Sequence, residues 1–336
     1  MQRLRDRLAR HAHWLGLAAA LGATGPALAA DYEGSPQVAE FVAEMTREYG
    51  FAGEQLTRLF AEAQRKQSIL DAISRPAEKV KPWKDYRPIF ITDSRIARGV
   101  DFWREHQATL ERAEQEYGVP AQVIVAIIGV ETFYGGNTGG YRVLDALSTL
   151  AFDYPPRAPF FRKELREFLM LAREEQVDPL SLTGSYAGAM GLPQFMPSSF
   201  RAYAVDFDGD GQINIWNNPV DAIGSVASYF QRHGWQAGEP VVSVARVSGE
   251  QVEQGLTPGL DPVNNLGELR ALGWSSRDAL SDDLPVTAFR LEGAEGDEYW
   301  LGLPNFFVIT RYNRSVMYAM AVNQLAELLA DARGHH

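Results

Sequence analysis

Residues 123–130 read Val-Ile-Val-Ala-Ile-Ile-Gly-Val, a run that would be apolar on every face of a helix. Pro120 suits the first turn of such a helix, and Gly135 and Gly136 can close it. A helix that is hydrophobic all round is stable only when it is buried on all sides. The rest of the chain must therefore fold around this helix. Its 336 residues allow two or three domains, and a hydrophobic content of 46% is ample for sizeable cores.

Glu131 follows this apolar run directly and would lie near the C-terminal end of the helix. The negative end of the helix dipole and the apolar surroundings both disfavour the ionised carboxylate, so both raise the pKa of Glu131. A carboxyl group that stays protonated near neutral pH is what general-acid cleavage of a glycosidic bond requires. This segment alone leaves a second interpretation open, in which Glu131 is paired with an arginine or hydrogen-bonded to a neighbouring loop.

Composition excludes several classes of function. Lys and Arg total 32 against 43 Asp and Glu, a formal charge of −11, and so acidic a surface repels the phosphates of nucleic acids. The chain has no cysteine, which removes disulfides, thiolate nucleophiles, cysteine-ligated zinc and a lipid attached through an N-terminal cysteine. The histidines beyond residue 29 form no ligand spacing, so no zinc site is expected.

The N-terminus has the pattern of a secretory signal peptide over residues 1–29. Four arginines within the first ten residues precede an apolar stretch from Trp14 to Ala23, and Ala27-Leu28-Ala29 supplies a small-x-small cleavage site. We expect cleavage after Ala29 and an exported, soluble mature chain. An uncleaved membrane anchor is the alternative, but the apolar stretch is shorter than the ~20 residues that span a bilayer.

Hydrophobic periodicity predicts helices over much of the chain. Between Pro36 and Gly118, apolar residues recur at three- and four-residue spacings, with one long run over residues 94–117. Residues 75–91 contain three prolines and are expected to be extended. A second helical block follows, with segments at residues 120–132, 142–152, 159–176, 197–204 and 219–233.

The pattern changes after Trp235. Residues 241–247, 284–291 and 298–303 are rich in β-branched and aromatic side chains, separated by Gly, Pro, Asp and Asn. This predicts a small antiparallel β module of ~70 residues. One apolar face from Ser315 to Ala332 then predicts a final helix.

A second informative segment lies at residues 184–199. Its glycines, Gln194 and several hydroxyl groups form a loop suited to close approach and hydrogen bonding of a ligand. Three motifs then occur in order along the chain, namely Glu131-Thr followed by Gly135, Gly188-Ala-Met-Gly-Leu-Pro-Gln194-Phe-Met-Pro, and Thr310-Arg-Tyr-Asn313-Arg-Ser. Together they resemble the lytic murein transglycosylases of the B type, glycoside hydrolase family 103.

The resemblance implies an α+β, mainly α fold with a lysozyme-like catalytic core. We assign the core, with an EF-hand-like loop, to residues 119–235, a helical domain to residues 30–118 and a small antiparallel β domain to residues 236–308. Residues 309–336 would carry the last motif and a helix that packs on the core or the helical domain.

The resemblance also implies the activity and the site. Family members cut the β-1,4 bond between N-acetylmuramic acid and N-acetylglucosamine of peptidoglycan without adding water and leave a 1,6-anhydro-muramic end. The matching positions suggest Glu131 as the only catalytic carboxylate. The positions that match substrate contacts of the family are Ser185, Gln194, Tyr229, Asn313, Tyr318 and, for glycan or stem peptide, Arg157. A second arginine that is common beside Arg157 is replaced by Pro156, which puts contacts on that side in doubt.

The signal pattern and the lack of a later apolar segment long enough to span a bilayer predict a soluble periplasmic protein. We expect a monomer without an organic cofactor. Its partners would be peptidoglycan strands, with other cell-wall enzymes as further candidates. Two alternatives stay open: a hydrolytic muramidase, and a peptidoglycan-binding scaffold without activity. A hydrolase needs a second carboxylate, for which Asp153 is the nearest candidate, although it is better explained as a turn or capping residue.

A third motif, Asp206-Phe-Asp208-Gly-Asp210-Gly-Gln212-Ile, fits the calcium loop of an EF-hand. Aspartates stand at loop positions 1, 3 and 5, and the backbone carbonyl of Gln212 would be the next ligand. Position 12 departs from the motif, being Asn217 instead of glutamate. The resemblance implies that Asp221 closes the loop instead. Without the bidentate glutamate, we expect a structural rather than a sensing Ca²⁺ site.

Overall fold

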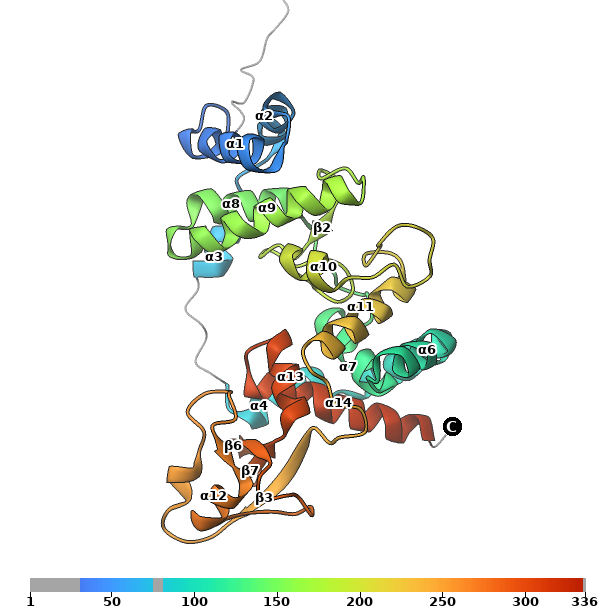
Figure 1. Ribbon diagram of the computed structural model, residues 1–336, viewed down its shortest axis with the longest axis vertical. Helices are drawn as coiled ribbons and strands as arrows, with labels where there is room; N and C mark the ends of the chain where they lie inside the picture. The colour runs from blue at the N-terminus through green and yellow to red at the C-terminus, as the bar shows by residue number, and fades with distance from the viewer. Residues whose placement is uncertain (1–30, 75–80, 335–336) are drawn as a thin grey trace, which may run out of the picture.

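The computed structural model describes residues 31–74 and 81–334 of an elongated molecule (Figure 1). Helices α1 (Pro36–Tyr49) and α2 (Gly53–Glu62) lie at one end, the small β-sheet lies at the other, and α7 (Ala121–Thr132) lies between them. The predicted signal peptide, residues 1–29, falls outside the described residues. Within the described ranges, none of the helices combines the length and the apolar character needed to cross a bilayer.

The end of the molecule that contains α1 and α2 is a layer of helices. The rings of Phe41 and Phe60 pack edge-on against Phe152, with centroids 5.9 and 6.0 Å apart. Arg162 pairs with Glu44 at 2.9 Å, so both aromatic and ionic contacts join the first two helices to the layer below. The elements here are α1 (Pro36–Tyr49), α2 (Gly53–Glu62), α3 (Gln67–Ser74), α8 (Val143–Asp153), η1 (Pro155–Arg157) and α9 (Ala158–Glu174).

Helix α4 corrects the expectation of extended chain over residues 75–91. It spans Trp83–Phe90, whereas residues 75–80 lie outside the described residues. Pro82 caps the helix, where proline is tolerated, and Pro88 removes only one hydrogen bond from the last turn. Complete burial of Trp83 stabilises the helix in spite of the prolines.

The long helix predicted over residues 94–117 is interrupted. His106, with φ −109° and ψ 25°, separates α5 (Asp93–Glu105) from α6 (Gln107–Tyr117). The described part of residues 30–118, which we expected to form one helical domain, therefore lies in two separate regions of the molecule. Helices α1–α3 lie with α8 and α9, and α4–α6 lie near α7 and α14.

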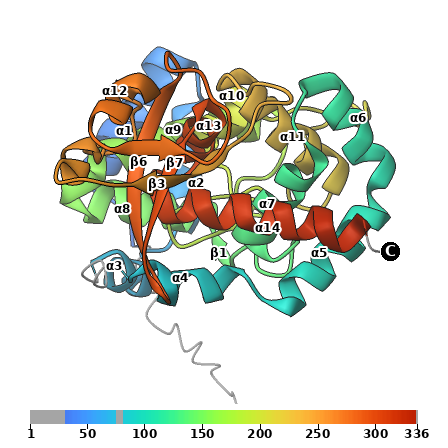
Figure 2. The same cartoon turned by 90° about the horizontal axis from the view of Figure 1, so that it is seen from below.

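Helix α7 (Ala121–Thr132) is the centre of the core, which confirms the first expectation from the sequence. Ten of its twelve residues are buried. It packs against α5, α6, α11 (Pro219–Arg232) and the last helix, α14 (Val316–Gly334), with which it runs side by side in Figure 2. The helices predicted over residues 120–132, 142–152, 159–176, 197–204, 219–233 and 315–332 are confirmed to within two residues at most ends, α10 being Pro197–Tyr203.

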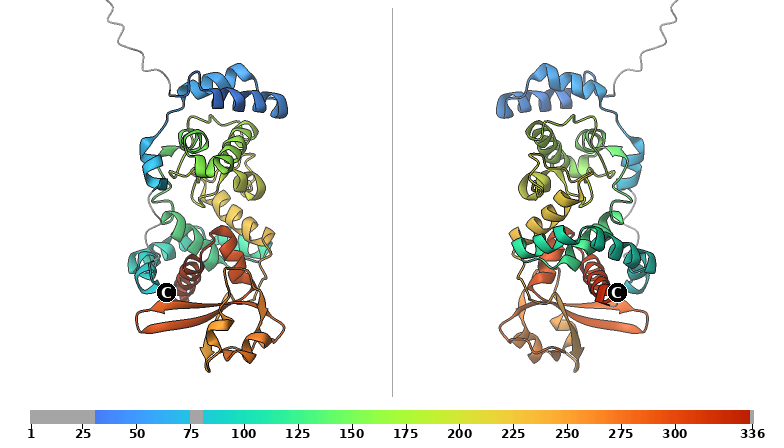
Figure 3. Two further views of the ribbon diagram at one scale, coloured as in Figure 1. Left: turned by 90° about the vertical axis from the view of Figure 1, so that its left-hand side faces the viewer. Right: turned by 90° about the vertical axis from the view of Figure 1, so that its right-hand side faces the viewer.

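The β module is a five-stranded antiparallel sheet with strand order β4-β6-β7-β3-β5, seen at the bottom of both views in Figure 3. Leu266, Trp274, Ala288 and Leu301 are buried in a small core of its own. The elements are β3 (Val242–Val247), η2 (Val252–Gly255), β4 (Asn264–Asn265), α12 (Leu266–Ala271), β5 (Trp274–Ser276), β6 (Pro285–Gly293) and β7 (Gly296–Gly302).

Two further elements bring the remaining motifs toward α7. A two-stranded ladder of β1 (Tyr141–Arg142) and β2 (Thr183–Gly184) joins the segment after α7 to the glycine-rich loop. Helix α13 (Pro304–Tyr312), which periodicity did not predict, follows β7 and delivers the last motif to the start of α14. The α+β, mainly α fold class is confirmed.

Candidate active site

Glu131 lies in the last turn of α7, where the residue is partly exposed while its carboxyl group is largely buried. Burial raises its pKa to about 7, in the direction expected from the apolar sequence around it. The hydroxyl of Tyr318, on α14, donates a hydrogen bond to Glu131 Oε1, which opposes this rise because it stabilises the charged form. The carboxyl group is therefore poised to exchange a proton near neutral pH.

Tyrosines surround this carboxyl group. Across the described ranges Glu131 forms no salt bridge, which removes the interpretation of a paired structural glutamate. Burial first, and then the charge of Glu131, raises the pKa values of Tyr86, Tyr312 and Tyr318, which come from α4, α13 and α14. Sequence reasoning missed Tyr86 because it falls in a stretch expected to be extended. It also passed over Tyr312, although Tyr312 stands inside the third motif.

The glycine-rich loop is fastened to the end of α7. Thr132 Oγ1 donates to the carbonyl of Leu192 at 3.0 Å. Gln194 adopts a positive φ of 52° and its amide donates to the carbonyls of Gly191 and Thr138. Ser185 Oγ accepts the N–H of Ala189 at 3.0 Å. The side chains of Ser185 and Gln194 therefore hold the loop in shape beside the end of α7.

Tyr229 connects α11 to the third motif. Its hydroxyl donates to the carbonyl of Arg311 at 2.6 Å, and its ring lies edge-on to Tyr312 with centroids 4.8 Å apart. Tyr312 in turn donates to the carbonyl of Pro193 at 2.5 Å. Asn313 is exposed at the end of α13. The structure thus brings Tyr229 and Asn313 to the same group of loops as Gln194.

Arg157 and Asp153 lie apart from this group. Arg157 is exposed on η1, with its guanidinium 4.5 Å from the centroid of Phe160. Asp153 accepts a hydrogen bond from Tyr32 at 3.0 Å and pairs with Arg65 at 3.3 Å, so it holds the N-terminal segment on α8. Asp153 is therefore structural. Within residues 31–74 and 81–334, no second carboxylate lies near enough to affect the pKa of Glu131.

Comparison with known proteins agrees with this geometry. The family model described as the transglycosylase SLT domain matches residues 33–327. This chain belongs to that family. It is 46% identical to the membrane-bound lytic murein transglycosylase B of Escherichia coli K12 over 312 residues, which cover 90% of this chain and 85% of the relative.

Two solved structures share the whole fold of this transglycosylase. Soluble lytic transglycosylase SltB1 from Pseudomonas aeruginosa, solved in a catenated form, is 75% identical with a TM-score of 0.89, covering 90% of this chain and all of SltB1. Lytic transglycosylase Slt35 from Escherichia coli, solved in complex with calcium, is 46% identical with a TM-score of 0.84, covering 90% of this chain and 96% of Slt35.

Three of the predicted metal ligands of the transglycosylase lie close together in the loop after α10. Asp206, Asp208 and Asp210 offer carboxylate oxygens that lie within 4.8 Å of one another. Asp221 is buried and stands outside this cluster, because it accepts the backbone N–H groups of Phe207 and Asn214, both at 2.8 Å. It ties the two sides of the loop together.

Gln212 is exposed, and its N–H donates to Asp210 at 2.9 Å. The three gathered oxygens are hard donors of the kind that Ca²⁺ prefers, so the residues present fit that ion. The assignments of Gln212 and Asp221 as ligands stay predictions.

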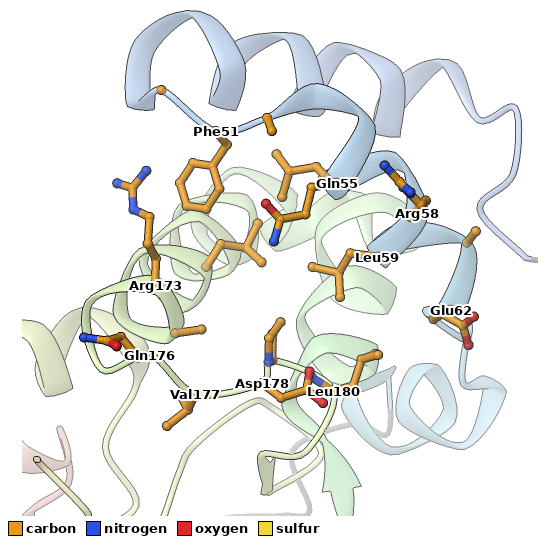
Figure 4. Close-up of a pocket in the computed structure, with 17 residues that line it drawn as sticks. Phe51, Gln55, Arg58, Leu59, Glu62, Arg173, Gln176, Val177, Asp178 and Leu180 are labelled. Atoms are coloured by element: carbon orange, nitrogen blue, oxygen red, sulfur yellow. The ribbon is translucent and has the colours of Figure 1, made fainter.

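A cavity of about 790 Å³ lies elsewhere, between α2 and the end of α9 (Figure 4). Phe51, Leu59 and Val177 line it together with Arg58 and Arg173. None of the predicted site residues of the transglycosylase lines this cavity. The candidate active site is therefore assigned by the chemistry around Glu131 and not by cavity size.

Replacing Tyr318 with phenylalanine is expected to shift the pH dependence of the transglycosylase upward. The hydroxyl of Tyr318 stabilises the ionised carboxylate, so its loss raises the pKa of Glu131 and the acid form persists to higher pH. A hydrogen bond to a charged group contributes roughly 1.5–3 kcal/mol, and one pKa unit corresponds to about 1.4 kcal/mol. We therefore expect the basic limb of the kcat/KM profile to move up by about one unit.

A control for this variant is Tyr141→Phe. The hydroxyl of Tyr141 bonds Ser68 at an exposed site away from Glu131, so its removal should leave the limb where it is. A basic limb that stays in place or moves down in Tyr318→Phe would contradict the role given to this hydroxyl.

Proposed function

We propose that this transglycosylase cleaves the β-1,4 bond between N-acetylmuramic acid and N-acetylglucosamine in peptidoglycan and leaves a 1,6-anhydro-muramic end. The observation that carries the proposal is the single carboxyl group of Glu131, with a pKa of about 7, faced by the hydroxyl of Tyr318. One group with that pKa can give and take back a proton near neutral pH. The family membership of the chain supports the same reaction class.

The reaction requires two proton transfers by the same group. Glu131 first protonates the leaving glycosidic oxygen, while the 2-acetamido oxygen of the muramyl residue attacks C1 and closes an oxazolinium ring. The Glu131 carboxylate then takes the proton of the muramyl 6-hydroxyl, whose oxygen attacks C1 and reopens the acetamide. No water is consumed, and the enzyme returns to its starting protonation state. The substrate's own acetamide thus replaces the second carboxylate of an ordinary glycosidase.

The side chains around Glu131 would orient the substrate for these steps. Hydroxyl and amide dipoles that are fixed before the reaction can stabilise the charge that develops on the ring. The residues proposed for this role are Ser185, Gln194, Tyr229, Asn313 and Tyr318, with Arg157 as a more distant contact for glycan or stem peptide.

Purified peptidoglycan sacculi test this function. Incubation with the protein should release soluble muropeptides in proportion to enzyme concentration. Binding to sacculi without any release would instead favour the scaffold without activity.

We also propose that Ca²⁺ binds Asp206, Asp208 and Asp210 and stabilises the fold. The solved complex of Slt35 with calcium supports this proposal. An ion that binds only the folded state raises the melting temperature by mass action, and the proposed chemistry needs no Lewis acid. We therefore expect added Ca²⁺ to raise Tm in differential scanning calorimetry and leave kcat unchanged.

The calcium proposal has a matched pair of variants. Substituting both Asp206 and Asp210 by asparagine should abolish the shift in Tm. Asp101→Asn, an exposed aspartate on α5, should retain it. Loss of turnover upon chelation, at a temperature where circular dichroism shows an intact fold, would contradict a purely structural ion.

For the cellular location, we propose the periplasm. The arginine-rich start, the apolar stretch and the Ala27-Leu28-Ala29 site support export and cleavage. Fractionation of cells should recover a processed chain that begins at Ala30 in the periplasmic fraction. Recovery of an unprocessed chain with membranes after a salt wash would contradict this location.

A further inference from the structure

The backbone that follows Glu131 is strained. Phe133 and Tyr134 both adopt left-handed conformations, with φ of 53° and 59°. Residues other than glycine rarely adopt this backbone conformation, so two of them in succession must be stabilised by the surrounding structure. The strained turn begins two residues after Glu131, so its conformation decides where the last turn of α7 ends.

Tyr134 is one of the supports of this turn. Its ring is buried between α5 and α7, against Gly99 and Gly129. A Cβ atom added at either glycine would lie only 2.3 or 2.5 Å from the Tyr134 hydroxyl oxygen. The two glycines therefore leave room for the ring.

Backbone hydrogen bonds from Phe133 to Gly129 and from Tyr134 to Ile128 close the turn, and Arg95, on α5, adds polar side-chain contacts that reach it from another helix. Its Nε donates to the carbonyl of Gly129 at 3.1 Å, in the last turns of α7. Its Nη1 donates to the carbonyl of Ile89 at 2.6 Å, in the last turn of α4. The guanidinium also lies 5.2 Å from the ring centroid of Phe133 and 5.4 Å from that of Phe90.

These contacts join the two helices that present Glu131 and Tyr86. A cation near a helix C-terminus is favourable. The planar guanidinium donates to the two carbonyls from two different nitrogen atoms, whereas a lysine side chain has only one nitrogen atom. The guanidinium charge itself is not among the causes of the pKa shift of Glu131. Its influence on the carboxyl group is therefore geometric.

We propose that Arg95 is a positioning residue for the transglycosylase reaction, which fixes the Glu131 carboxyl relative to α4 by holding the carbonyls of Gly129 and Ile89 and the ring of Phe133. This inference rests on the proposed function of Glu131. Arg95 transfers no proton and contacts no substrate. Its loss loosens the turn, displaces the carboxyl group and admits water to it.

The first test is the kinetics of Arg95→Ala on soluble peptidoglycan oligomers. A displacement of about 1 Å costs on the order of 100-fold in rate, so we expect kcat to fall by about that factor while KM changes by less than about threefold. Water reaching Glu131 lowers its pKa, so the basic limb of the profile should move to lower pH. The titratable groups that face Glu131 are Tyr86, Tyr312 and Tyr318, whose pKa values are all raised, so this limb reports Glu131.

Two further measurements separate positioning from folding. Guanidinium ion at millimolar concentration should restore part of the kcat of Arg95→Ala, and ammonium ion should not. Arg95→Lys should keep the melting temperature near that of the native chain but lose at least about tenfold in kcat, because it keeps the charge and loses the double contact. The matched control is Arg98→Ala, exposed on the same helix and 5.9 Å from Phe133, which should stay within twofold of the native kcat.

Each outcome decides the proposal. Native kcat and an unmoved pH limb in a folded Arg95→Ala or Arg95→Lys would overturn it, as would a loss of activity that only follows a loss of folded protein. If Arg95→Ala does not fold, the kcat of folded Arg95→Lys gives the decision. An inactive native chain would instead reject the proposed function of Glu131 itself.

Discussion

Glu131→Gln is expected to remove nearly all turnover and to leave the fold intact. The amide can neither donate the proton to the leaving oxygen nor recover one from the 6-hydroxyl, and a positioned general acid or base contributes about 10²–10⁴-fold. Because Glu131 serves in both steps, we expect a loss of at least about 10³-fold. The amide oxygen can still accept the hydrogen bond of Tyr318, so the melting temperature should change little. Release of muropeptides and calorimetry measure the two effects.

Asp153→Asn is the matched control for this variant. Asp153 holds Tyr32 and Arg65 and has no place in the proposed chemistry, so its amide should lower stability and not kcat. Substantial turnover in a folded Glu131→Gln protein would move the catalytic role to another residue. Loss of kcat in a folded Asp153→Asn protein would point to Asp153 as a second catalytic carboxylate.

Digestion of peptidoglycan in ¹⁸O-water should yield products whose muramyl C1 carries no label. The 6-hydroxyl attacks within the same sugar, and a well-oriented intramolecular group has an effective concentration of about 10⁵ M or more, far above that of water. The products should therefore be anhydro-muropeptides, lighter by one water than the products of hydrolysis. Mass spectrometry of the separated muropeptides measures both the mass and the label.

A hydrolytic muramidase, run beside the enzyme in the same labelled water, provides the positive control. Its products should carry solvent oxygen at the muramyl C1. Labelled reducing-end muramic acid as the main product of this protein would reject the transglycosylase mechanism. It would also require a second catalytic carboxylate, whereas no carboxylate among residues 31–74 and 81–334 contributes to the pKa shift of Glu131.

Local patterns in the sequence were enough to predict the central helix and its carboxyl group. The run at residues 123–130 is apolar on all faces, so burial of α7 follows from composition alone, and so does a raised pKa for the glutamate at its end. The Asp206-Asp208-Asp210 spacing likewise places three carboxylates together, because alternate residues of one tight loop converge. Both features are determined by residues that lie close to one another in the sequence.

Local sequence patterns did not predict the structure where contacts between distant segments outweigh the intrinsic conformational propensity of the residues. The prolines of residues 82–88 argue for extended chain, yet burial of Trp83 makes this stretch a helix that carries Tyr86. Packing also directs the carboxylate of Asp221 to two backbone N–H groups, and its assignment as a metal ligand stays a prediction. Neither outcome is encoded in residue spacing.

The sequence thus singled out Glu131, which we propose as the catalytic residue, and the tertiary structure decided the partners of its carboxyl group. Tyr318 is 187 residues from Glu131 along the chain, and Arg95 reaches the end of α7 from another helix. Periodicity states which face of a helix is buried, but not which distant side chain covers it. That choice is made when α5 and α14 pack on α7, and α4 and α13 pack on α14. Only then are the hydroxyl and guanidinium groups brought within hydrogen-bonding distance.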